Sequence, residues 1–195
     1  MKPQRTDPDI YQLRIVLRDI KMVTRFIQIS HEKRVYMANR NRAVPAVYLI
    51  VERGAKLLIA RRCNTGYEDG NYQVPAGHVE PGELPKESMV REAKEEIGVR
   101  IDPVDLELVH ISYRPPHDQT GNRVDLFFRA HQWSGEITNA EPDKCDDLRW
   151  VGYEELPDNM TPHVRHAIDC IQEGIIYSEL SVDFLKQHGR YMLGE

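Results

Sequence analysis

The chain has 195 residues, which is enough for one ordinary domain with a core and marginal for two. Hydrophobic residues make up 41% and charged residues 29%, a balance that excludes a mainly disordered chain and fits a folded soluble protein. The longest apolar run, residues 46–51, is far shorter than the roughly 20 residues that a membrane helix needs, so no membrane partner is expected. The first thirty residues also lack the apolar stretch of a secretory signal.

The net charge of −5 is unevenly distributed along the chain. Residues 1–42 contain ten Lys or Arg and four Asp or Glu, a balance of +6, which leaves 16 basic and 27 acidic residues elsewhere. A basic arm on an acidic body suggests either a nucleic-acid contact or a flank that docks on its own domain. The second interpretation is favoured, because five apolar residues recur at helical spacing: Ile10, Leu13, Val16, Leu17 and Ile20.

Strand and helix patterns alternate from Ala43 onward, where the composition changes. The predicted strands are residues 46–52, 56–62, 72–74, 106–113, 124–131 and 148–151, the first two joined by a short hairpin at 53–55. The predicted helices are residues 85–97, 161–173 and 182–188. This order predicts an α/β or α+β fold, with a basic, partly helical extension at 1–42, one domain at 43–175 and a helical tail at 176–195 packed on that domain.

The cysteines are three in number, widely spaced and without a C-x-x-C pair: Cys63, Cys145 and Cys170. This argues against a disulfide framework or a cysteine-based zinc site, and it predicts a reducing compartment, the cytoplasm.

The helix predicted at 85–97 carries an unusual concentration of acids. At about 100° per residue, Glu92, Glu95 and Glu96 share one arc beside the apolar stripe. Three neighbouring carboxylates repel one another, so a positive partner is expected, and oxygen ligands select a hard cation such as Mg²⁺ or Mn²⁺. Helix spacing alone fits a solvated acidic face equally well, with Arg91 offsetting part of the charge.

The surrounding residues favour the metal. Residues 77–99, GHVEPGELPKESMVREAKEEIGV, fit the pattern G-x5-E-x7-R-E-U-x-E-E-x-G-U, in which U is a bulky aliphatic or similar residue. Eight positions match, while Ala93 is a small occupant of the first U position. This segment resembles the Nudix box of the Nudix hydrolase superfamily, to which MutT-like proteins belong. The resemblance covers roughly residues 43–175 and implies a Nudix-type α/β/α sandwich with a mixed central sheet.

The resemblance also implies roles for single residues. Glu92, Glu95 and Glu96 would bind divalent cations together with the main-chain carbonyl of Ala76, and Glu83 would steady the loop or contact a further metal. Arg91 would hold the glutamates in position. Glu92 is the first choice for the base that takes a proton from the attacking water. Many members have Gly-Gly at the position of Ala76-Gly77, so metal geometry, not catalysis, is where this chain is expected to differ.

Substrate contacts must lie outside the box. Arginines at strand ends suit phosphate, although each could equally be a surface charge, and tyrosines could stack on a base or be buried. The candidates are Arg61, Arg62, Arg114 and Arg123 for phosphate, Tyr67, Tyr72 and Tyr113 for a base, and Glu141, Asp146 and Asp147 as a further ligand or base.

The resemblance predicts metal-dependent hydrolysis of a nucleoside diphosphate linked to a group X. A (deoxy)nucleoside triphosphate or oxidised nucleotide, cleaved to a monophosphate and pyrophosphate, is placed ahead of ADP-ribose or a nucleotide sugar. Two further alternatives are a pyrophosphohydrolase of RNA 5′ ends guided by residues 1–42, and a nucleotide-binding module without turnover. Mg²⁺ is the expected cofactor, with Mn²⁺ as a substitute, and a homodimer is left open.

Overall fold

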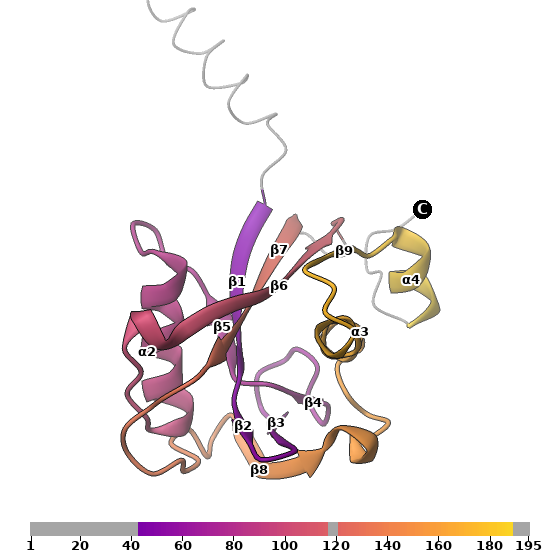
Figure 1. The fold of residues 1–195 in the computed structure, drawn as a ribbon. Coiled ribbons are helices and arrows are strands. Elements are labelled where there is room, and N and C mark those ends of the chain that lie inside the picture. The colour runs from indigo at the N-terminus through magenta and orange to yellow at the C-terminus, as the bar shows by residue number, and fades with distance from the viewer. Residues whose placement is uncertain (1–42, 117–120, 189–195) are drawn as a thin grey trace, which may run out of the picture. The chain divides into compact units, whose positions relative to one another are not determined.

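A computed structural model describes residues 43–116 and 121–188, and the helix predicted in residues 1–42 lies outside them. Two sheets form the body of the described part (Figure 1). The first has the strand order β5-β1-β7-β6-β9, with parallel and antiparallel pairs, so the predicted mixed sheet is confirmed. Its strands are β1 (Ala43–Ile50), β5 (Ala76–His78), β6 (Leu106–Arg114), β7 (Asn122–Ala130) and β9 (Tyr177–Glu179).

The second sheet is antiparallel, and its strand β3 pairs with each of the other three strands. It contains β2 (Glu52–Arg53), β3 (Lys56–Arg62), β4 (Tyr72–Gln73) and β8 (Cys145–Gly152). The helices are α2 (Pro85–Ile97), α3 (Pro162–Gln172) and α4 (Val182–Gln187), with short 3₁₀ turns at Pro103–Asp105 and Tyr153–Glu155. In Figure 1, α2 covers one face of the first sheet and α3 lies on the other, which gives the expected sandwich.

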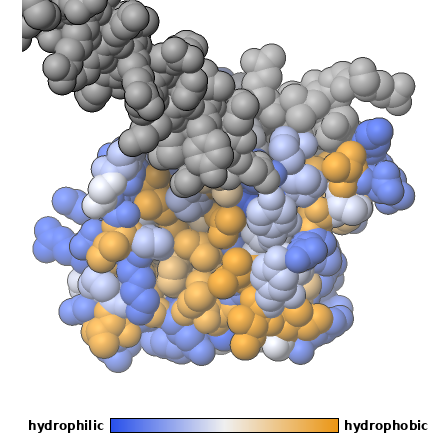
Figure 2. Space-filling model, turned by 90° about the horizontal axis from the view of Figure 1, so that it is seen from above, coloured by the Kyte–Doolittle hydropathy of each residue, from blue (hydrophilic) through white to orange (hydrophobic). Residues whose placement is uncertain are grey.

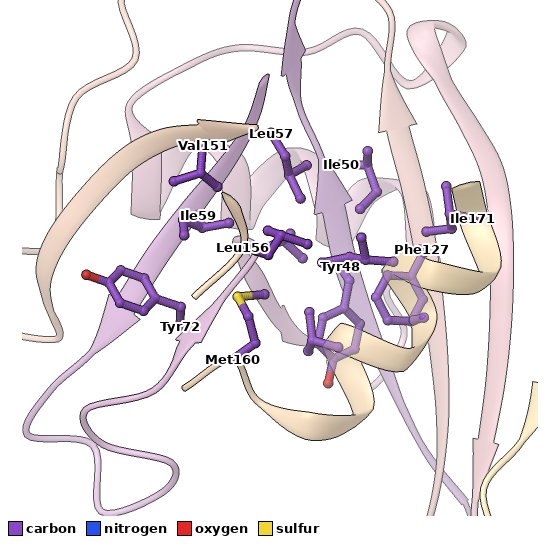
Figure 3. Packing of buried hydrophobic residues seen from close by; sticks show 14 of the residues in the cluster. Tyr48, Ile50, Leu57, Ile59, Tyr72, Phe127, Val151, Leu156, Met160 and Ile171 are labelled. Atoms are coloured by element: carbon purple, nitrogen blue, oxygen red, sulfur yellow. The ribbon is translucent and has the colours of Figure 1, made fainter. Parts of the chain in front are cut away.

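Strand β1 is central to both halves of the core. Successive side chains of a strand point to opposite faces, and here both faces are apolar. Tyr48 and Ile50 join a cluster with α3, and the Tyr48 ring stacks on Phe127 of β7 (Figure 3). Val47 and Leu49 join the cluster under α2. The continuous run Ala46–Val51 is therefore buried on both sides, as a strand between two helical layers requires.

Each predicted strand and helix between residues 43 and 188 is present, with ends shifted by a few residues. Three strands were not predicted as separate elements: β2, which the prediction did not divide from β1, and also β5 and β9. β5 has only three residues within the box, and β9 lies in the segment 176–195 that was predicted to be helical. β9 pairs in parallel with β6, and the buried His110 fixes this region because its ring nitrogens bond the carbonyl of Ile175 at 2.8 Å and the Ser178 hydroxyl at 2.9 Å. The tail is therefore part of the sheet before it becomes helical.

Apolar side chains are not confined to the interior. Figure 2 shows apolar residues gathered on the face seen from above, with hydrophilic residues around them. Large exposed apolar side chains include Ile175, Ile176 and Tyr177 at the edge strand β9.

Within residues 43–116 and 121–188, no helix has the length and apolar character needed to cross a bilayer.

The packing of α2 gives a first prediction. Met89 is fully buried between α2 and the sheet, whereas Lys94 on the same helix is exposed. We expect Met89→Ala to lower the free energy of unfolding by about 2–5 kcal/mol, because it removes buried contacts and leaves a cavity. Lys94→Ala should change it by less than about 0.5 kcal/mol. Urea unfolding of both variants measures this, and similar losses would contradict the packing described for α2.

Candidate active site

Helix α2 starts and ends where the sequence predicts. Pro85 occupies its first turn, where a missing N–H costs nothing, and the Glu87 carboxylate accepts a hydrogen bond from the Leu84 amide at 3.0 Å. Gly98 ends the helix in the left-handed conformation, with φ of 73°. Between these ends, Met89, Ala93 and Ile97 are buried, and this fixes the rotation of the helix that presents its acidic edge.

Arg91 connects the acidic residues of the box. Its guanidinium pairs with Glu83 at 3.0 Å, with Glu92 at 2.6 Å and with Glu95 at 3.2 Å, and it donates to the His78 carbonyl at 3.1 Å. The bond from Arg91, followed by one from Ser88, lowers the pKa of Glu83 to about 2. Arg91 therefore ties the box loop to the helix, a geometry that agrees with the positioning role implied by the resemblance.

The three glutamates of the predicted metal site differ in burial. The Glu95 side chain is 50% exposed and the Glu92 side chain 13% exposed. Burial raises the pKa of Glu92, with Arg91 opposing the rise. Burial also raises the pKa of Glu96 to about 8, although this carboxylate accepts a hydrogen bond from the Ala76 amide at 2.9 Å. The half-buried Glu96 carboxylate is thus held at Ala76, the residue whose carbonyl belongs to the predicted ligand set.

Gly77 lies directly against the side chain of Glu92. A Cβ atom at Gly77 would overlap the carboxylate of Glu92. The neighbouring Ala76 lies in strand β5, so its methyl group causes no backbone conflict. A side chain at position 77 would therefore force the Glu92 carboxylate out of its place beside β5.

A cavity of about 590 Å³ opens beside this edge of α2. Its wall includes Glu92, Glu95, Glu96 and Ala76 of the predicted metal site. It also includes five of the six predicted substrate contacts, Arg61, Arg62, Arg114, Arg123 and Glu141. The fold thus brings acidic and basic residues from distant parts of the sequence to one hollow.

The cavity arginines have different partners. Arg61 pairs with the exposed Asp146 at 2.7 Å, while Arg62 donates to the carbonyl of Tyr67 at 2.8 Å. The Arg123 guanidinium lies 3.1 Å from a ring nitrogen of His78. Each of these guanidiniums lines the cavity with its positive charge near the acids.

Arg114 differs from the contact that the sequence predicts. It is 3% exposed, and it forms a bidentate pair with the fully buried Asp125 at 2.6 and 3.1 Å. Burial disfavours the charge of Arg114, but Asp125 more than compensates and raises its pKa. The pair is neutral as a unit, so Arg114 offers directed N–H groups to the cavity and little net charge for a phosphate.

Tyr72 does not fit the predicted contact with a base. It is 4% exposed within the core cluster around α3, its hydroxyl donates to Asp147 at 2.5 Å, and it is absent from the cavity wall. The reason is the alternation of β4, which turns Tyr72 into the core and its neighbour Gln73 toward the cavity. Tyr67, in the preceding loop, does line the cavity.

Sequence reasoning missed several residues of the cavity wall, among them Gln73, His78 and Lys144. His78 could have been placed from its position in the box, and Lys144 from its acidic loop beside Glu141, to which it is paired at 2.8 Å. For Gln73 the available signal was the period of two along its strand.

The acidic residues can be compared with the needs of a cation. Among the described residues, no three His, Cys, Asp or Glu side chains are gathered closely enough to form a finished metal site. The donor atoms are nevertheless all oxygens, which suits a hard divalent cation. The close approach of Gly77 to Glu92 and the positions of Glu92 and Glu96 keep these oxygen donors at one wall of the cavity. In donor type, and in lining one wall of the cavity, the residues fit such a cation.

Comparison with known proteins decides the family. A family model of the NUDIX domain matches residues 39–170. The chain belongs to the Nudix family. The predicted membership is thereby confirmed, and Nudix hydrolases cleave phosphoanhydrides and generally depend on a divalent metal.

Relatives and solved structures agree with this placement. A NAD-capped RNA hydrolase NudC of Stutzerimonas stutzeri is 34% identical over 116 residues, covering 60% of this chain and 39% of that protein. NudC of Pseudomonas aeruginosa is 34% identical over 131 residues, covering 66% and 44%. This chain thus spans less than half the length of these relatives.

Among solved structures, a MutT NUDIX hydrolase from Burkholderia pseudomallei matches with a TM-score of 0.60 at 24% identity, over 66% of this chain and 97% of that one. The MutT protein of Methanosarcina mazei matches with a TM-score of 0.58 at 19% identity, over 69% and 96%. At these identities the likeness shows the fold, which is the predicted Nudix sandwich.

The close approach of Gly77 to the Glu92 carboxylate, called here the Gly77 cradle, gives a second prediction. Gly77→Ala should lower turnover of a nucleotide substrate about 100-fold, because the methyl group displaces the Glu92 carboxylate from its place. Gly152→Ala is the matched control, since a Cβ at Gly152 meets only ordinary contacts of 3.5 Å and more. Steady-state kinetics with thermal melts of both variants checks this, and full activity of Gly77→Ala would refute the cradle.

The buried Glu96 gives a third prediction, for protein without metal. Its pKa is about 4.5 in the unfolded chain and about 8 in the folded one, so the folded state holds the proton more tightly. Stability should therefore fall as the pH rises from about 4.5 to about 8. Glu96→Gln lacks this loss, so its melting temperature should exceed the wild-type value increasingly across that range in chelator. Parallel curves for the two proteins would show that Glu96 titrates normally.

Proposed function

We propose that this chain hydrolyses a diphosphate linkage in a nucleoside diphosphate attached to a second group X, with the help of Mg²⁺ or Mn²⁺. The observation that carries the proposal is the composition of the cavity, in which the acids of α2 face basic residues from other elements. A diphosphate and an acidic helix repel each other unless a cation lies between them. The basic residues of the same wall suit the remaining phosphate charge.

The oxygen donors assigned to the cation are Glu92, Glu95, Glu96 and the carbonyl of Ala76. A bound divalent cation would supply neutralisation of phosphoryl oxygens and a water of lowered pKa. Glu83 is assigned to the box loop, because its carboxylate is engaged by Arg91 and Ser88 and it is absent from the cavity wall.

The remaining residues bind and orient the substrate. Arg62, Arg123 and Lys144 are assigned to phosphate oxygens, since each lines the cavity. Glu92 is assigned as the base that accepts a proton from the attacking water, and Arg91 holds it by a 2.6 Å ion pair. Glu141 lies at the same wall, where its pairing with Lys144 orients that ammonium group.

Two substrate classes are proposed. The first is a (deoxy)nucleoside triphosphate or oxidised nucleotide, cleaved to a monophosphate and pyrophosphate. The second is a dinucleotide or nucleotide sugar of the ADP-X kind, free or at an RNA 5′ end. The second is supported by the similarity to proteins named as NAD-capped RNA hydrolases.

A nucleotide panel tests the function. Wild-type protein with Mg²⁺ or Mn²⁺ should cleave at least one of dGTP, oxidised dGTP, ADP-ribose, NAD and NAD-capped RNA, and chelator should stop the reaction. Pyrophosphate release identifies the first class, and AMP with a phosphorylated second product identifies the second. Absence of cleavage across the panel, or full activity in chelator, would refute the proposed function.

The base assignment gives a fourth prediction. Glu92→Gln should lower kcat roughly 100- to 10,000-fold while the protein stays folded, because it removes a proton acceptor and a ligand charge but little volume. Glu154→Gln, at an exposed position, is the matched control and should keep wild-type turnover. Near-normal kcat of Glu92→Gln would remove Glu92 from the reacting centre.

A further inference from the structure

Gln73 is a polar side chain of the cavity wall to which the site described above assigns no role. It is 6% exposed, and it lines the cavity. Among residues 43–116 and 121–188, no side chain or backbone group forms a hydrogen bond with its side-chain amide. The amide atoms are not closed off from solvent, so they open into the cavity. An amide held in place at a cavity wall with its donor and acceptor unused is available to a ligand.

The neighbours of Gln73 indicate what shape of group it meets. In the second sheet, Gln73 of β4 pairs with Ala60 of β3, and Ala60 pairs in turn with Leu148 of β8. Directly paired residues of antiparallel strands present their side chains on the same face. All three residues line the cavity, so they form a row across three strands. Because Ala60 has only a methyl side chain, the middle of this row leaves space for a ligand.

The chemistry of this row differs from that of the rest of the cavity. Ala60 and Leu148 are apolar, Gln73 is neutral, and Leu148 packs with the cluster that contains Ile97 of α2. The arginines and Lys144 lie on other segments of the wall, at strand ends and in loops. A phosphate would lose its hydration against such a row without gaining a charge. A flat, neutral group with hydrogen-bonding edges suits it better.

We propose that the row formed by Gln73, Ala60 and Leu148 is the nucleobase subsite of the cavity, and that Gln73 reads the base. A glutamine amide offers one donor and one acceptor side by side, a match for the N7 acceptor and N6 amino donor of adenine. The inference rests on the proposed function in that a nucleotide enters this cavity. It goes further by assigning adenine as the preferred base and Gln73 as a specificity-determining residue.

The placement agrees with the position of the acids. Gln73 is separated by two residues from Ala76, whose amide bonds Glu96. The base-reading amide and the carboxylates thus lie on one continuous stretch of chain, β4 to β5, along the same wall. A nucleotide with its base on the row can extend its phosphates along this wall toward α2.

Binding of AMP and GMP tests the inference independently of catalysis, because neither contains a diphosphate linkage. Calorimetry with Mg²⁺ present should show that wild-type protein binds AMP more tightly than GMP. Gln73→Leu, which has similar volume but no amide, should weaken AMP binding about 10- to 100-fold. Gln73→Glu presents only acceptors, so it should favour GMP, whose N1–H and N2–H groups are donors. Gln132→Leu, at an exposed position, is the control and should bind like wild type.

Stability and kinetics distinguish base reading from a structural role. Gln73→Leu should melt within a few degrees of the wild-type temperature, because no described residue is bonded to the side-chain amide that it removes. With an adenine substrate its KM should rise about 10-fold or more while kcat stays within a few-fold. Unchanged AMP affinity, a wild-type preference for GMP, or a Gln73→Leu protein that melts several degrees lower or fails to fold would each overturn the inference. If wild-type protein binds AMP as described but cleaves no nucleotide, the proposed function fails while this subsite stands.

Discussion

The close approach of strand β5 to helix α2 is the constraint on which the candidate site depends. Gly77 has no side chain, so the Glu92 carboxylate occupies the place where a Cβ would be. The Ala76 amide beside it bonds Glu96, and the His78 carbonyl accepts from Arg91. Each of the three residues of β5 therefore contacts one residue of helix α2 that belongs to the site. The helix can take this place only because Met89, Ala93 and Ile97 fix it to the sheet.

The carboxylates of the site do not all repel one another at full strength, because they lie in two kinds of environment. Glu83 and Glu95 share the guanidinium of Arg91, and the bond from Arg91 lowers the pKa of Glu83. Glu96 is buried with a single amide partner, and burial raises its pKa to about 8. A protein selected for stability alone would not bury a carboxylate in this way. The cost is understandable if a cation takes the place of the proton when substrate binds, and this supports the proposed metal dependence.

The sequence was most informative where local rules decide the structure. The apolar stripe, Pro85 and Gly98 define α2, and the alternation of β1 defines a strand buried on both faces, so both were predicted. The spacing of the box predicts Arg91 beside the glutamates, and Arg91 forms ion pairs with Glu92 and Glu95. Long-range pairing was less accessible. β9 is short and pairs with β6 through residues more than sixty positions away, and nothing in its own composition distinguishes it from a loop.

Arg114, Tyr72 and Gln73 show why a site is harder to predict than a fold. Arg114 reads as a free charge at a strand end, but Asp125 on the next strand neutralises it. Tyr72 and Gln73 are adjacent, and only the register of β4 against β3 decides which of them reaches the cavity. The sequence favours the aromatic residue, because a tyrosine resembles a base-stacking group and a glutamine resembles a surface residue. The structure reverses the order. An amide that opens into the cavity with no partner among the described residues indicates a ligand more strongly than an aromatic ring that already belongs to the core.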